Sequence, residues 1–145
     1  MQPLAEIAQH RRGISSPRTA EDELDRQLRR AEDAIQRRAW GVFASVVLRC
    51  GIDEEGGGEW QESLCFGQMD GRWRLHLQSG FNADPSSLKQ MDLFAASLET
   101  RLLAADRVPL LIQALQTAQA KSVRETGSVA RELASFVDRF LRTDC

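Results

Sequence analysis

The chain has 145 residues, of which 28% are charged, with a formal net charge of -2 and a pI of about 5.7. This length fits one domain with a hydrophobic core that needs neither disulfides nor metal. The charge balance argues against a protein that coats nucleic acid or anionic membranes, because such proteins carry a basic excess.

Cysteine usage and hydropathy favour a cytoplasmic protein. Cys50, Cys65 and Cys145 are odd in number, far apart and without a Cys-x-x-Cys pair, so we expect reduced thiols. Residues 1–20 lack a continuous apolar segment, and no stretch approaches the roughly 20 apolar residues of a membrane span. We therefore expect no secretory signal and no membrane contact, and the composition suggests a bacterial or phage protein.

The N-terminal region is predicted to be an arm followed by a helix. Residues 1–19 form a polar, mobile arm in this prediction, and residues 20–145 form a single domain. A helix of about five turns starts after Thr19, which is a suitable N-cap. The charged residues of this helix, including the pair Asp25 and Arg29, are expected to lie on a solvated face. Its apolar stripe consists of Leu24, Leu28, Ala31 and Ile35.

A strand is predicted after the first helix, at residues 40–50. Alternate positions there are apolar, β-branched residues are frequent, and Gly51 follows as the expected end. Residues 51–62 are predicted to be an acidic, solvated loop, whose carboxylates lack the ligand spacing of a calcium site. Trp60 lies in this predicted loop, where we expect it to cap the core, with an exposed interface anchor as the alternative.

The dipeptide Asp70-Gly71 between two alternating runs predicts a β-hairpin with a type I′ turn. The turn sets the pairing register, and the hairpin joins the preceding strand in a three-stranded antiparallel meander. The face that carries Phe66 and Leu75 is predicted to be core, and the other face is polar and basic. The predicted cross-strand pairs are Met69–Arg72, Gln68–Trp73, Gly67–Arg74, Phe66–Leu75, Cys65–His76 and Leu64–Leu77.

The polar face of the hairpin carries a basic strip. Arg72, Arg74 and His76 alternate along one strand. Together with Arg11 and Arg12 of the arm, they are the predicted contact residues if the protein binds nucleic acid. Sheet-based RNA binders present aromatic residues on such a face, whereas the aromatic residues of this hairpin lie on the other side. Nucleic-acid contact is therefore our second hypothesis.

The same face places Cys65 beside His76, which is the arrangement of a thiol–histidine pair or of half a zinc site. A catalytic dyad also needs an orienting group and an oxyanion donor, and a zinc site needs about four ligands. The only other histidine in the sequence is His10, in the predicted arm. We therefore predict no catalytic residue, no metal and no cofactor, and a thiol-dependent enzyme is the third hypothesis.

Helical sequence is predicted from the dipeptide Asp84-Pro85 onward. Asp is a suitable N-cap, and Pro is tolerated at the first helical position because its missing N–H has no partner there. The apolar residues between Leu88 and Ala105 keep a helical period. Pro109 is expected to break this helix shortly after it.

The C-terminal part is predicted to be helical and amphipathic. Residues 107–142 follow an approximate heptad, polar around Gly127, so they form one long helix or two helices that meet there. The last part, residues 128–142, has an apolar face that we expect to pack in the core against the first helix and the sheet. An interface with a second protomer or a foreign protein is the alternative. This face consists of Val129, Leu133, Phe136, Val137, Phe140 and Leu141.

These elements predict an α+β fold with an N-terminal helix, a three-stranded antiparallel meander, and either a C-terminal helical hairpin or one long helix. The sequence shows long amphipathic helices and no motif for site chemistry. This combination favours a non-enzymatic protein-binding module, such as a small adaptor, a chaperone-like protein or an inhibitor, that self-associates as a homodimer or larger homo-oligomer. The predicted partner-binding residues are Phe136, Phe140, Val129, Leu133 and Trp60.

Overall fold

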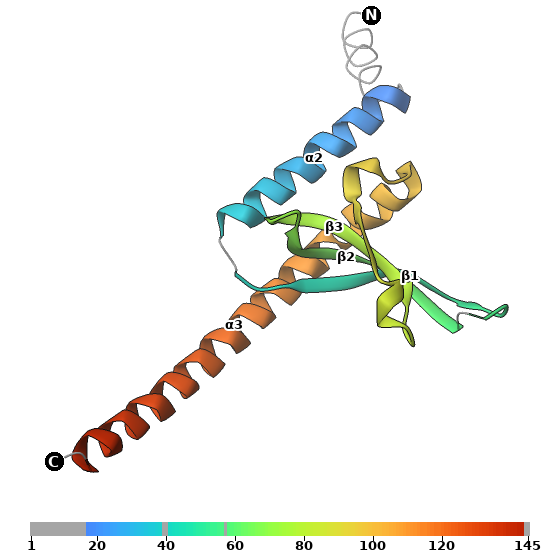
Figure 1. Ribbon diagram of the computed structural model, residues 1–145. Helices are drawn as coiled ribbons and strands as arrows, with labels where there is room; N and C mark the ends of the chain where they lie inside the picture. Colours follow the sequence, from blue (N-terminus) through green and yellow to red (C-terminus); the bar gives the residue numbers. More distant parts are fainter. Residues whose placement is uncertain (1–16, 39–40, 57, 144–145) are drawn as a thin grey trace, which may run out of the picture.

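The computed structural model describes residues 17–38, 41–56 and 58–143. It contains an N-terminal helix, an antiparallel sheet of four strands in the order β1-β2-β3-β4, and a long C-terminal helix (Figure 1). The predicted α+β class is confirmed, with four strands in place of three. The elements are α2 (Pro17–Arg37), β1 (Ala44–Asp53), β2 (Gly58–Met69), β3 (Arg72–Phe81), β4 (Lys89–Asp92), α3 (Leu98–Thr143) and two 3-10 turns, Pro85–Ser87 and Leu93–Ala95.

Helix α2 confirms the predicted first helix and its apolar stripe. Leu28 and Ile35 are buried, and Leu24 packs against them. The helix begins at Pro17, so residues 17–19 of the predicted arm are helical. The rest of that arm, including Arg11 and Arg12, lies outside the described residues.

The hairpin of β2 and β3 has the predicted register at every pair from Met69–Arg72 to Leu64–Leu77. Asp70 and Gly71 have φ angles of 54° and 78°, the left-handed conformation that a type I′ turn requires at both central residues. Because the turn chemistry is local, the sequence alone is sufficient to set this part of the sheet.

Strand β1 begins and ends later than the predicted residues 40–50, and it does not end at Gly51. Gly51 pairs with Trp60 of β2, and a Cβ atom at residue 51 would lie 2.8 Å from the indole ring. The glycine therefore makes room for the indole within the pairing, and both strands continue past it. The predicted loop at residues 51–62 is wrong, because most of these residues belong to β1 and β2.

The predicted helix after Asp84 is wrong as far as Ser97, and only its last part, from Leu98, is helical, as the start of α3. Asp84 does cap a helical turn, since its carboxylate accepts a hydrogen bond from the Ser86 backbone N–H at 3.1 Å, but that turn ends at Ser87. The chain then forms β4, which pairs with residues 76–79 of β3. Hydrogen bonding to the outer edge of β3 thus overrides the weak helical periodicity of this segment.

Helix α3 is continuous from Leu98 to Thr143 and runs through Pro109. The predicted break is wrong, and the question of one helix or two is answered in favour of one. Proline removes a single backbone hydrogen bond from the helix. Its side chain is exposed here, while Ala104 and Leu111 on either side of it are buried against the core of the sheet and α2, which we call the body. Packing on both sides holds the two parts of the helix in line.

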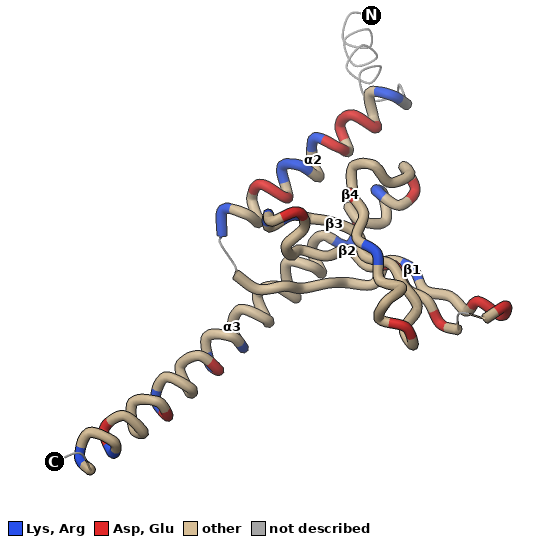
Figure 2. Tube along the Cα trace, in the orientation of Figure 1, with Lys and Arg blue, Asp and Glu red and all other residues tan. Residues whose placement is uncertain are grey.

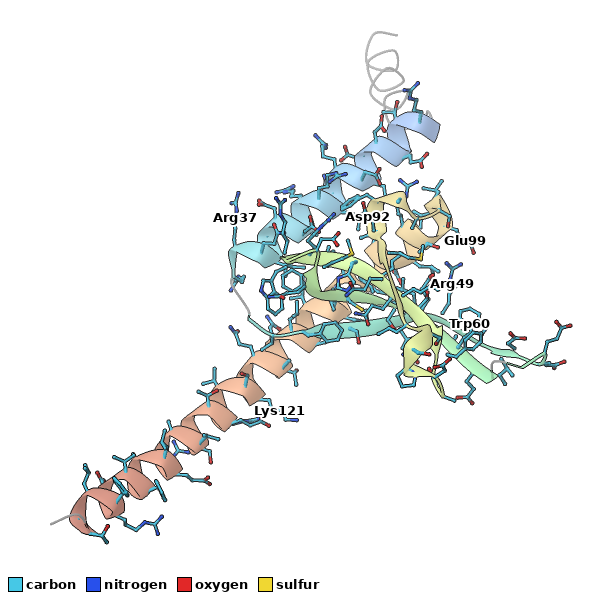
Figure 3. All side chains as sticks on the ribbon, viewed as in Figure 1. Arg37, Arg49, Trp60, Asp92, Glu99 and Lys121 are labelled. Atoms are coloured by element: carbon cyan, nitrogen blue, oxygen red, sulfur yellow. The ribbon has the colours of Figure 1, made fainter. Side chains whose placement is uncertain are left out.

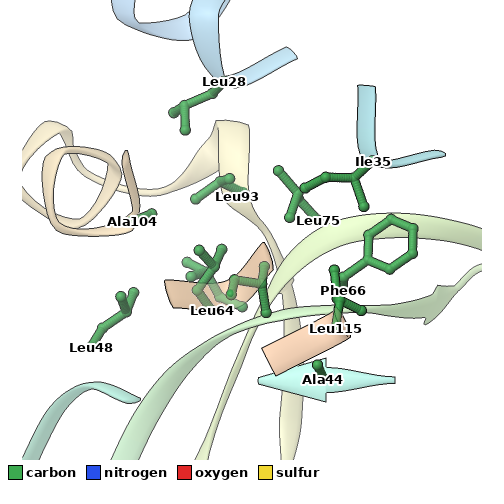
Figure 4. Close-up of a cluster of buried hydrophobic side chains, with 12 residues drawn as sticks. Leu28, Ile35, Ala44, Leu48, Leu64, Phe66, Leu75, Leu93, Ala104 and Leu115 are labelled. Carbon is green, nitrogen blue, oxygen red and sulfur yellow. The ribbon is translucent and has the colours of Figure 1, made fainter. Parts of the chain in front are cut away.

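The core lies between the sheet and the two helices (Figure 4). Strands β1, β2 and β3 contribute buried apolar side chains from the face that the strand alternation predicts, such as Leu64 and Phe66 of β2 and Leu75 of β3, whereas β4 contributes none. Helix α2 contributes Leu28 and Ile35, and α3 contributes a short series that ends at Leu115.

Helix α2 also bonds to the backbone of β3 where β4 does not reach. The Glu32 carboxylate accepts a hydrogen bond from the Leu75 N–H at 3.0 Å, and the Gln36 side-chain amide donates to the Trp73 carbonyl at 2.8 Å. Glu32 and Gln36 are four residues apart and so share one helix face. They satisfy backbone groups of β3 that have no partner strand.

Candidate interaction surface on the distal part of helix α3

Helix α3 divides into a part that packs on the sheet and a part that leaves it. All the buried residues of α3 lie between Thr100 and Leu115. Beyond them the helix projects away from the sheet (Figure 1), and every residue from Ser128 to Thr143 is exposed. We call residues 98–115 the proximal segment and residues 116–143 the distal segment.

The distal segment carries an apolar stripe, which we define as Val129, Leu133, Phe136 and Phe140. Their exposed fractions are 62%, 58%, 59% and 59%. The sequence identifies this face, but the expectation that it packs in the core is wrong. A helix of 46 residues is about 69 Å long, whereas the longest strand of the sheet, β2 with 12 residues, is only about 40 Å long. The body is too small to cover the whole helix.

The apolar stripe continues the face that packs on the sheet. Val129 and Leu133 follow Leu111 and Leu115 at a spacing of 18 residues, which is about five full turns of an α-helix. Leu111 and Leu115 are completely buried. The same side of one helix therefore contributes to the core near the sheet and faces solvent beyond it. Single exposed apolar residues are common on protein surfaces, but a contiguous stripe is typical of an interaction site.

The predicted basic strip does not form one exposed surface. Arg72 is exposed, but the Arg74 guanidinium lies 3.7 Å from the Asp92 carboxylate of β4, and His76 is completely buried. Figure 2 shows that acidic and basic residues are interspersed along α2 rather than separated. Among the described residues, Arg72 is thus the member of the strip that faces solvent without an ion pair.

The predicted neighbours Cys65 and His76 are cross-strand partners in a buried, satisfied environment. His76 Nδ1 lies 3.1 Å from the Arg74 carbonyl, which only accepts, so Nδ1 carries the proton and Nε2 accepts from the Gln78 amide at 3.2 Å. Burial lowers the pKa of His76, and the neutral ring fits these partners.

Burial raises the pKa of the Cys65 thiol to about 12. A nucleophilic or metal-binding cysteine needs the thiolate, which this environment disfavours. Among the described residues, no cluster of three or more His, Cys, Asp or Glu side chains is arranged to hold a metal ion. Likewise, no helix in the described ranges has the length and hydropathy to cross a bilayer.

Trp60 lies in β2 near the end of the sheet, away from the main core (Figure 3). Its ring covers Gly51 and lines a shallow depression with Cys50, Ile52 and Asn82. The side chain is half-buried. It is thus held by the β1–β2 pairing, and it lies on a different element from the apolar stripe.

Sequence reasoning missed a set of arginines that tie the elements together. Arg101 of α3 is buried and donates hydrogen bonds to Asp25 of α2 at 2.7 Å and to Glu21. Arg29, which we expected to pair with Asp25, instead lies over the Phe94 ring at 3.9 Å. These pairs join residues up to 80 positions apart, so local spacing gives no signal for them.

No family model matches this chain, and searches of curated proteins and of solved structures also find no match.

Proposed function

We propose that this chain is a non-enzymatic protein-binding module that self-associates through the apolar stripe of the distal segment. The observation that carries this proposal is the row of four large apolar side chains, each more than half exposed, on the projecting part of α3. Burying such side chains contributes about 1.5–3 kcal/mol each when burial is complete. A partner that covers the stripe therefore gains substantially in free energy.

Helix physics supports the same proposal. Most helices in proteins owe their stability to packing of an apolar face rather than to intrinsic propensity. The distal segment extends about 42 Å from the last buried residue, and it includes Gly127, which is unfavourable inside a helix by about 1 kcal/mol. A partner helix would supply the packing that the body of the same chain does not provide.

The first prediction is that Phe136→Asp combined with Phe140→Asp abolishes self-association and leaves the monomer folded. Two carboxylates on the stripe would have to be desolvated at the interface, whereas in the monomer they face water. Sedimentation velocity over a range of concentrations measures the association. Circular dichroism and urea unfolding report whether the monomer is intact.

The matched control is Ala120→Asp combined with Ala134→Asp, which adds the same charge to exposed positions of the distal segment that lie outside the stripe. This variant should associate as the original chain does. Loss of association in both variants would attribute the effect to charge alone. Unfolding of the Phe136 and Phe140 variant would assign these side chains to the core and contradict the proposal.

A further inference from the structure

We propose that the occupant of the apolar stripe is the distal segment of a second copy of this chain, lying antiparallel, with Leu133 of each copy facing Phe136 of the other. This inference rests on the self-association proposed above and specifies its geometry. The two helices overlap over residues 126–143, and the two sheets lie at opposite ends of the assembly.

The spacing of the stripe is that of a coiled-coil seam. Its apolar members, Val129, Leu133, Phe136 and Phe140, are separated by four, three and four residues, with Thr126 three residues before them and Thr143 three residues after them. Alternating steps of three and four are the a and d positions of a heptad. In an antiparallel pair, each a position of one helix packs in a layer with a d position of the other.

The register is selected by the requirement that apolar side chains of one helix meet apolar side chains of the other. Pairing Leu133 with Phe136 also pairs Val129 with Phe140, and symmetry repeats each layer, so the four central layers are entirely apolar. A shift of one heptad towards the body would place Phe136 against Thr126 instead. That register buries polar side chains against phenylalanine rings and is disfavoured.

Charge complementarity selects the same register. Glu132 and Arg139 are seven residues apart and flank the stripe on one side. Both are exposed, and neither forms an ion pair within the described part of the chain. In the proposed register, Glu132 of each copy lies beside Arg139 of the other, which gives two ion pairs. The shifted register places Arg139 beside Glu125, which already pairs with Lys121 of its own helix, and it brings the two Glu132 side chains together, which is repulsive.

A parallel pair lacks this complementarity. In a parallel coiled coil, the flanking position of Glu132 faces the position of Val137, so Glu132 has no ion-pair partner there, and Arg139 faces position 144, which follows the last residue of α3. The antiparallel arrangement also separates the bodies. Residues 116–125 lie between the overlap and the sheet and span about 15 Å, so the end of one helix stops short of the partner's sheet. The polar residues Gln119 and Ser122 then stay in water.

Charge reversal tests the register. Glu132→Arg alone and Arg139→Glu alone each replace two attractive pairs with two repulsive ones. We expect each single variant to weaken dimerisation by about three- to tenfold at low salt. Glu132→Arg combined with Arg139→Glu restores the pairs with reversed polarity and should return the dissociation constant to the original value. Sedimentation equilibrium of the full-length chain measures all four proteins.

A distance measurement tests the orientation. A spin label at Ala120→Cys is attached in a chain with Cys50→Ser and Cys145→Ser; Cys65 is buried and does not compete for the label. Two labels at residue 120 should lie roughly 45 Å apart in the antiparallel dimer, but only about 10–20 Å apart in a parallel one. Double electron-electron resonance distinguishes these values.

The outcomes separate the two proposals. A long distance together with rescue by the double charge reversal supports the antiparallel register. A dimer with a short distance, or one indifferent to the charge reversals, overturns the register but leaves self-association through α3 in place. A chain that stays monomeric at every concentration overturns self-association itself and the register with it.

Discussion

The proximal and distal segments of α3 present the same kind of face in different surroundings. Leu111 and Leu115 in the proximal segment are completely buried, whereas Val129 and Leu133, about five turns further on, are more than half exposed. The local sequence pattern does not distinguish the two. What differs is the reach of the sheet, which ends before the helix does. An amphipathic pattern therefore predicts that a face will be covered, but not which molecule covers it.

The largest expected effect comes from the same substitution in each segment. Leu115→Ala removes buried methyl groups and should lower the free energy of unfolding by about 2–5 kcal/mol, because a cavity remains in the core. Leu133→Ala lies on the same helix face but in solvent, and it should change the stability of the monomer by less than about 0.5 kcal/mol. Urea unfolding at concentrations low enough to keep the chain monomeric measures both.

Similar losses at the two positions would show that the distal segment folds back onto the body. In that case, the contrast between the segments would be wrong. Conversely, Leu133→Ala should weaken self-association, and Leu115→Ala should not do so in the folded chain.

A smaller effect is expected from the ion pairs that anchor the proximal segment to α2. Arg101→Met leaves Asp25 and Glu21 without their partner, at exposed fractions of 31% and 38% for their side chains. Because these carboxylates are partly solvated, we expect a loss of about 1–3 kcal/mol rather than the larger penalty of a fully buried pair. Arg131→Met in the distal segment is the control and should be nearly neutral. Thermal unfolding that changes equally in both variants would contradict this assignment.

The smallest expected effect is a pH dependence of the free energy of unfolding, caused by the buried side chain of His76. Burial lowers the pKa of His76 in the folded state, so the unfolded chain binds its proton more readily. The free energy of unfolding should therefore be unaffected by this group above about pH 6.5 and should fall below it, by at most about 1.4 kcal/mol per pH unit. His76→Asn should flatten the profile between pH 7 and 5. Leu133→Ala should leave it unchanged, and an equal flattening in that variant would contradict the assignment.

The parts of the fold that the sequence predicts are those with local determinants. Asp70 and Gly71 set the turn, and the register of β2 and β3 follows from it. By contrast, β4 forms because the edge of β3 is available, and α3 continues through Pro109 because both flanks pack on the body. These causes lie in tertiary contacts, which no window of sequence contains.

The candidate surface is likewise predictable only in its local features. Periodicity identifies Leu133 and Phe136 as one apolar face, but the expectation of core packing assumed a body large enough to cover it. The predicted basic strip does not form an exposed surface for a related reason. Strand β4 brings Asp92 to Arg74, and His76 is buried. In both cases, a neighbour distant in sequence decides the exposure of the residue.

The bonds from Glu32 and Gln36 to the backbone of β3 also affect the behaviour of the protein at high concentration. An unprotected strand edge offers a row of backbone groups on which the strand of another chain can grow, and this is a common route to aggregation. Here a helix occupies those groups beside a short final strand, so residues 73–75 of β3 present no such template. The outer strands of the sheet are β1 and β4, and the four residues of β4 leave little edge on that side for another strand to pair with.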